Sequence, residues 1–166
     1  SPAQAPGDGI GDKRLVVRLK EKLLTAMLNP HLLEALETLY ETYNRREFVH
    51  PDPLETLYQF TTPADREIGA LLAAGLAYGR VAQILRSINT LFALLGPSLT
   101  HAVTPASLKK HEAQIGALRH RFTSGDELYT FLQGIGRVRE KHGSLEALFT
   151  QGYSREGDVR GGLAAL

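Results

Sequence analysis

The sequence lacks cysteine and tryptophan and contains a single methionine. Without cysteine the chain can form no disulfide, no thiolate metal site and no cysteine nucleophile. Histidine, aspartate and glutamate are therefore the side chains left for metal binding or acid–base chemistry. The absence of tryptophan, together with an aromatic content of 7%, argues against a carbohydrate-stacking surface.

A strong excess of charge and long apolar runs are also absent. Nineteen Lys and Arg residues against eighteen Asp and Glu residues leave a formal charge of +1 over 166 residues, so the composition indicates no polyanionic or membrane partner. The longest apolar run, residues 68–78, is much shorter than the roughly 20 residues of a membrane span, and residues 1–11 do not resemble a signal peptide. We therefore expect a cytoplasmic protein with no membrane partner.

Helix starts are the clearest local signal. A short polar residue stands before proline four times, where its side chain can accept from free first-turn amides while proline occupies the first helical position. These dipeptides are Asn29-Pro30, Asp52-Pro53, Thr62-Pro63 and Thr104-Pro105. The pattern predicts helices over residues 13–28, 30–45, 53–60, 63–78, 80–95, 105–119, 125–142 and 144–151, and no stretch is typical of a strand.

The predicted helix over residues 63–78 differs from the others, because every residue from Ile68 to Tyr78 is apolar or glycine. Such a helix is expected to be covered by protein on nearly all sides. The helix over residues 30–45 instead has one apolar stripe and is expected at the surface. The sequence thus predicts an all-α fold, a compact multi-helix bundle around a buried central helix, with residues 1–12 as a flexible lead and residues 13–166 as a single helical domain.

The densest polar segment is the loop between two predicted helices, and its polar residues are Asn44, Arg45, Arg46, His50 and Asp52. A functional interpretation has the two arginines hold a phosphate, with His50 and Asp52 across the loop. A structural interpretation makes Asp52 a helix cap, places the arginines at the negative end of a helix and gives His50 a loop hydrogen bond.

A metal centre would combine His50 and Asp52 with Asp65 and Glu67, because imidazole and carboxylate groups suit hard or borderline ions. Their spacing matches no metal-ligand pattern, and the other histidines are scattered. No metal and no cofactor are therefore expected. A metal- or phosphate-dependent enzyme built on the 44–52 loop remains an alternative hypothesis, as does a protein-interaction module using the acidic face of residues 34–41.

The segment Tyr78-Gly79-Arg80 separates two predicted helices. A glycine before a helix N-terminus exposes amide groups where a phosphate or carboxylate can lie, with Arg80 beside it and Tyr78 able to stack on a base. The alternative is an ordinary tight turn between helices with a glycine C-cap.

Basic residues cluster in the second half of the chain, at Lys109-Lys110-His111, at Arg119-His120-Arg121, and at Arg137, Arg139 and Lys141. Such clusters can follow a phosphate backbone or form solvated helix faces. Residues 132–137 carry the Leu-x-Gly-hydrophobic-Gly core of a helix-hairpin-helix motif, for which the alternative is a continuous helix containing two glycines.

Four longer strings, at residues 43–55, 65–68, 76–88 and 143–149, resemble a family of uncharacterised bacterial proteins known as a domain of unknown function. The resemblance covers residues 31–151. Members of this family are distantly similar to helix-hairpin-helix DNA glycosylases, which implies a glycosylase-like helical domain and DNA as a partner. The residues expected at the nucleic acid are Tyr78, Gly79, Arg80, Arg86, Arg119 and Arg121.

The glycosylase resemblance also implies a catalytic aspartate in a Leu-Asp-x-His-like stretch. Asp158 lies among glycines without those neighbours, so the sequence contains no recognisable catalytic aspartate. The chain is therefore predicted to be catalytically incomplete and to be the N-terminal part of a longer protein.

Overall fold

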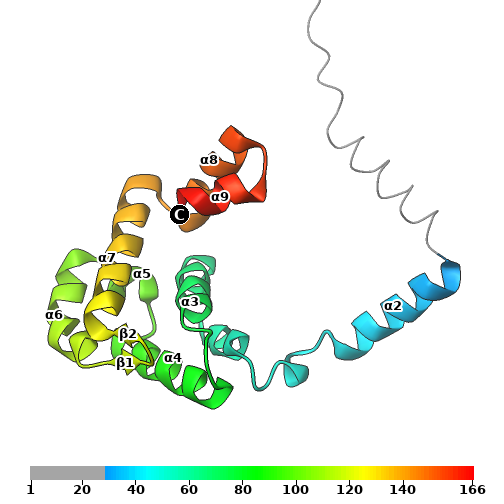
Figure 1. Cartoon of the computed structure of the whole chain (residues 1–166), viewed down its shortest axis with the longest axis horizontal. Coiled ribbons are helices and arrows are strands. Elements are labelled where there is room, and N and C mark those ends of the chain that lie inside the picture. Colours follow the sequence, from blue (N-terminus) through cyan, green and yellow to red (C-terminus); the bar gives the residue numbers. More distant parts are fainter. Residues whose placement is uncertain (1–28) are drawn as a thin grey trace, which may run out of the picture. The chain divides into compact units, whose positions relative to one another are not determined.

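The computed structural model describes residues 29–166 and divides them into two units, residues 29–48 and Val49–Leu166 (Figure 1). Each unit is considered by itself. The helix predicted over residues 13–28 and the flexible lead predicted over residues 1–12 lie outside the described residues. The predicted single domain over residues 13–166 stays a prediction.

The first unit consists of helix α2 (Pro30–Tyr43) and the 3-10 turn η1 (Arg46–Phe48). The Asn29 side chain accepts from the backbone N–H of His31 at 3.0 Å, which confirms the predicted helix start. No residue of α2 is buried, as expected of a surface helix. Its apolar stripe is exposed as well, at Leu32, Leu36, Leu39, Tyr40 and Tyr43.

The second unit contains the remaining elements. They are η2 (Pro53–Gln59), α3 (Pro63–Gly75), α4 (Val81–Leu95), α5 (Leu99–Ala102), α6 (Pro105–Gly116), β1 (Arg119–His120), β2 (Thr123–Ser124), α7 (Gly125–His142), α8 (Leu145–Glu156) and α9 (Val159–Ala165). The all-α class is confirmed, and the side chains of Asp52 and Thr62 cap the helices that they were predicted to start. Within residues 29–166, no helix is both long enough and apolar enough to cross a membrane.

Helix α3 lies in the core and packs against η2, α5 and α8. Its Ile68 and Leu72 are almost completely buried, together with Ile88 and Leu91 of α4 and Leu132 of α7. The opposite side of α3 is exposed at Ala70 and Ala74. The expectation of cover on nearly all sides was therefore wrong, because alanine and glycine leave little apolar area in water and need no partner there.

Helix α7 runs without interruption through residues 132–137. The structure therefore has the continuous helix rather than the helix-hairpin-helix turn. Gly136 allows close packing, since a Cβ atom at this position would collide with the carbonyl oxygen of Val103 between α5 and α6. One of the two glycines thus serves helix packing.

The connection between α6 and α7 is a β-hairpin, which the sequence did not predict. Its strands pair Arg119 with Ser124 and His120 with Thr123 in antiparallel register, so that Arg121 and Phe122 form a two-residue turn. Only the first turn position, Arg121, has a positive φ (52°), the pattern of a type II′ turn. The helix predicted to reach residue 119 ends at Gly116 because the chain must reverse before α7 begins.

Candidate functional site

The turn between α3 and α4 packs against the β-hairpin through Tyr78. Its hydroxyl donates to the carbonyl oxygen of His120 at 3.0 Å and lies 2.6 Å from the hydroxyl of Thr123. The rings of Tyr78 and His120 meet edge to face, with centroids 4.7 Å apart. Tyr78 is partly buried in this contact and holds the hairpin against the helix turn.

His120 completes the connection from the hairpin side and is only 1% exposed. Its Nε2 atom lies 3.2 Å from the carbonyl oxygen of Tyr78 and its Nδ1 atom lies 2.9 Å from the hydroxyl of Ser87 on α4. A carbonyl only accepts, so Nε2 carries the proton, and in the neutral ring Nδ1 accepts from Ser87. The imidazole thereby joins β1, the α3–α4 turn and α4.

Gly79 has a backbone conformation with φ of +109°, which L side chains rarely adopt. A Cβ atom at Gly79 would also lie 2.7 Å from Cδ of Arg121. The aliphatic part of Arg121 therefore crosses directly over this glycine, and a side chain at position 79 would force Arg121 to move.

Four arginines lie on the segments that this contact joins. Arg80 occupies the N-cap position of α4, Arg86 lies on α4, and Arg119 and Arg121 lie on the hairpin. All four are exposed, and none forms an ion pair with any residue in the described part of the chain. The structure thus places the six residues that the sequence selected for nucleic-acid contact on the α3–α4 turn, on α4 and on the hairpin that packs against them.

Glu127 is an acid that interacts electrostatically with Arg119 of this group. Hydrogen bonds from the backbone N–H and the hydroxyl of Ser124 lower the pKa of its carboxyl, and Arg119 adds a smaller lowering effect. These bonds form a capping box at the start of α7. The carboxylate is therefore committed to the helix cap.

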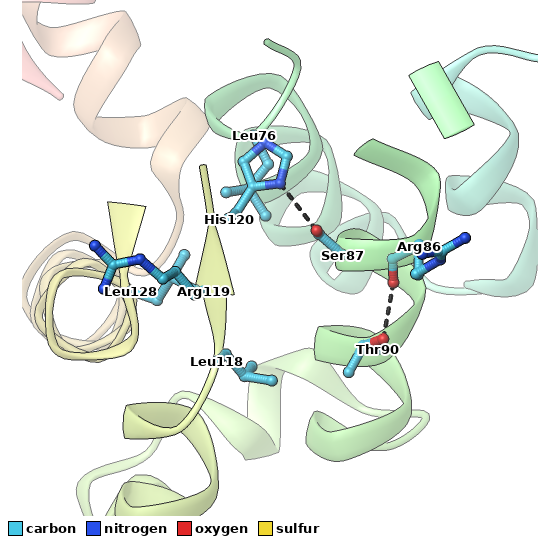
Figure 2. Close-up of a pocket in the computed structure, with 8 residues that line it drawn as sticks. All are labelled: Leu76, Arg86, Ser87, Thr90, Leu118, Arg119, His120 and Leu128. Atoms are coloured by element: carbon cyan, nitrogen blue, oxygen red, sulfur yellow. Dashed lines mark hydrogen bonds between the residues drawn. The ribbon is translucent and has the colours of Figure 1, made fainter. Parts of the chain in front are cut away.

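A cavity of about 160 Å³ opens between β1 and α4 beside His120 (Figure 2). Leu76, Leu118 and Leu128 provide its apolar lining, while Ser87 and Thr90 contribute hydroxyl groups. Arg86 and Arg119 also line it from opposite sides, and in Figure 2 their guanidinium groups point away from each other. Two of the four arginines therefore adjoin a partly apolar hollow.

Phe122 is the residue of this site that the sequence did not indicate. Its side chain is 82% exposed at the tip of the hairpin, and the guanidinium carbon of Arg121 lies 5.4 Å from the ring centroid. One feature of the sequence could have indicated it: Phe122 is a single aromatic residue between the polar residues Arg121 and Thr123 and does not belong to a helical pattern of apolar residues.

The polar loop divides between the two units. In the first unit, Asn44 is the C-cap of α2, and Nε of Arg45 donates to the carbonyl oxygen of Glu41 at 3.2 Å. Arg46 begins η1. The Arg45 contact agrees with the structural interpretation, in which a cation supports the end of the helix.

His50 and Asp52 belong to the second unit and also have local structural contacts. Nδ1 of His50 lies 2.7 Å from a carboxylate oxygen of Glu55, and Asp52 accepts from the backbone N–H of Leu54 at 2.8 Å. Both contacts are within one turn of η2, which again agrees with the structural interpretation.

Asp65 and Glu67, the other two candidate metal ligands, connect elements of the fold. Asp65 accepts from the hydroxyl of Thr62 at 2.6 Å and from the backbone N–H of Thr100 at 2.8 Å. Burial raises its pKa, but these hydrogen bonds outweigh that effect and hold the pKa below its ordinary value. Glu67 pairs with Arg139 at 3.7 Å. Across residues 29–166, the histidine and carboxylate side chains form no group of three that could hold a metal ion.

The other basic clusters are partly neutralised. Lys109 pairs with Glu112 at 2.6 Å, and Arg139 is held by Glu67. Asp158 caps α9, since it accepts from the backbone N–H of Gly161 at 2.7 Å. Asp158 therefore acts as a helix cap, and nothing in its contacts indicates a catalytic role.

Fold and site together describe an all-α protein in which arginines gather around one hairpin. A family model described as a protein of unknown function, DUF2400, matches residues 52–166, and the chain belongs to this family. The predicted membership of a family of unknown function is confirmed, although the match begins later than residue 31 and continues to the end of the chain. The comparisons found no similar curated protein and no similar solved structure.

Proposed function

We propose that this protein binds nucleic acid, DNA in the first instance, through the hairpin surface. This name denotes the exposed side chains of Arg80, Arg86, Arg119, Arg121 and Phe122. The observation that carries the proposal is the contact between Tyr78 and His120, which are 42 positions apart and bring two arginine-bearing segments to one place. The DUF2400 match includes all of these residues.

The charge of the hairpin surface supports a polyphosphate ligand. The chain as a whole has a formal charge of only +1, yet this surface carries four arginines that form no ion pair within residues 29–166. Guanidinium groups suit phosphate because their planar donors can form two parallel hydrogen bonds to its oxygens. A local positive field of this kind attracts an anionic backbone without a large net charge.

The start of α4 supports the same ligand. Arg80 is its N-cap residue and makes no hydrogen bond from its side chain to the first turn. The first amides of a helix point outward and carry the positive end of the dipole, where a phosphate is stabilised. Arg80 stands beside these amides.

The proposal is tested by fluorescence anisotropy of labelled DNA between about 50 and 200 mM salt, a range over which phosphate contacts weaken binding steeply. We expect the double variant R119Q/R121Q to bind more weakly and to reduce the slope of log K against log salt by about two. R160Q is the matched control, because Arg160 is exposed on α9 at the other end of this unit (Figure 1). Absent or salt-independent binding by the unmodified protein would contradict the proposal.

A further inference from the structure

Phe122 is exposed in a way that packing does not explain. Among the side chains that the structure describes, no other large hydrophobic one is as exposed; the next is Tyr40 at 63%. Burial of apolar surface is favourable, so a ligand that covers this exposed ring would gain binding free energy. We infer that Phe122 stacks on an unpaired base and that the hairpin surface prefers single-stranded nucleic acid; this inference rests on the proposed function.

The position of the ring is defined by the chain around it. His120 and Thr123 on either side of the turn are both bonded to Tyr78, and Arg121 crosses Gly79. The ring therefore projects from an anchored turn rather than from a free loop. The anchored turn holds the backbone of Phe122 in a defined place on the hairpin surface.

The second face of the ring is available to a base. The guanidinium group of Arg121 lies over the ring at 5.4 Å from the centroid, in cation–π range. A base stacked on the other face would complete a layer of guanidinium, phenyl ring and base. Two other exposed aromatic side chains already have an aromatic partner, since Tyr153 stacks on Phe149 and Tyr43 contacts Phe48.

The charge around Phe122 selects nucleic acid over a protein partner. An apolar protein surface would require apolar neighbours, whereas the chain neighbours of Phe122 are Arg121 and Thr123, and Arg119 lies on the adjoining strand. Single-stranded binding sites combine cationic side chains along the backbone with aromatic rings under the bases. The hairpin surface has both components.

A single strand fits better than a duplex for an energetic reason. Bases in a duplex are stacked on each other, and a ring that inserts between them must first pay for unstacking. An unpaired base has a free face and carries no such penalty. Phe122 should therefore contribute to affinity for single strands and contribute little to affinity for duplex.

The absence of tryptophan provides a direct measurement of stacking. F122W introduces the sole tryptophan of the chain, and its emission should be quenched when short oligothymidylate binds at low salt. Y153W is the matched control, because Tyr153 is 44% exposed on α8, at the other end of the same unit (Figure 1). Its emission should stay unchanged at the same occupancy.

Affinity supplies the second readout. We expect F122A to weaken binding of oligothymidylate by about tenfold, the effect typical of losing one stacked base, and to leave duplex binding within about twofold. Binding by F122W without quenching, an unchanged affinity of F122A, or stronger binding of duplex than of single strand would each overturn the inference and leave the proposed function standing. No binding of either form by the unmodified protein would overturn the proposed function itself.

Discussion

Tyr78 and His120 bind each other's backbone: the Tyr78 hydroxyl donates to the His120 carbonyl oxygen, and the His120 ring donates to the Tyr78 carbonyl oxygen. Each side chain thus satisfies a polar group of the other residue, which would be costly to leave unpaired in a buried place. The two residues are 42 positions apart, so this exchange fixes how the α3–α4 turn meets the hairpin.

Removal of the Tyr78 hydroxyl is the first test. Y78F leaves the carbonyl of His120 and the hydroxyl of Thr123 without this partner, and we expect a loss of about 1–2 kcal/mol in the free energy of unfolding. Urea denaturation measures the change. Y153F is the control, because Tyr153 is exposed and no hydrogen bond of its hydroxyl occurs among the described residues. Equal stability of both variants would show that the bond contributes nothing.

A side chain at Gly79 should destabilise the fold. G79A combines an unfavourable positive φ with a collision against Arg121, and we expect it to cost about 1–3 kcal/mol in the free energy of unfolding. Gly96 is the matched control, because its φ of +80° is also positive but a Cβ atom there would meet no neighbour. G96A therefore measures the cost of a positive φ without a collision, and the additional change R121A in G79A should recover the part of the cost that is due to the collision. No recovery of stability by R121A would contradict the close approach.

Asp65 gives the fold a pH dependence at the acid end. Its pKa is lower in the folded chain than its ordinary value of 3.8, so its ionised form stabilises the fold above that value. This contribution disappears as the pH falls through the lowered pKa. D65N should lower the free energy of unfolding by about 1–3 kcal/mol at neutral pH. In acid, the stability of D65N should change less with pH than that of the unmodified protein. Thermal unfolding from neutral to acid pH tests this, with D126N as the control on an exposed carboxyl.

The ion pair of Glu67 and Arg139 should stabilise the joint between α3, α7 and α8. Both side chains are 21% exposed, and Glu67 also accepts from the backbone N–H of Glu146 at 2.5 Å. E67A leaves Arg139 and this amide without their partner, so we expect a loss of about 1–3 kcal/mol in the free energy of unfolding. E112A removes the exposed partner of Lys109 and should cost less than about 1 kcal/mol. Similar losses in the two variants would contradict a structural role for the Glu67 pair.

Much of the helical framework was predictable because its signals are local. Asn29, Asp52 and Thr62 cap helices as their position before proline indicates, and the predicted bounds of α7 match the structure. The hairpin was missed because its turn contains Arg121 and Phe122 in place of the glycine or asparagine that marks such turns.

The candidate site was only partly predictable, since its residues come from distant parts of the chain. Tyr78, Arg80, Arg119 and Arg121 were each selected, but local spacing contains nothing that pairs position 78 with position 120. Phe122 was not predicted, because helical periodicity identifies residues that face a core, whereas this side chain is exposed to water.

The two-residue turn of the hairpin has an entropic consequence for binding. His120 and Thr123 are hydrogen-bonded to Tyr78, and the Arg121 side chain packs on Gly79. The backbone of the turn that carries Phe122 is therefore ordered before any ligand binds. Binding then needs to restrict only a few side-chain torsions, and a phenylalanine side chain has just two. A surface this small therefore loses less affinity to the ordering of its backbone than a free loop would.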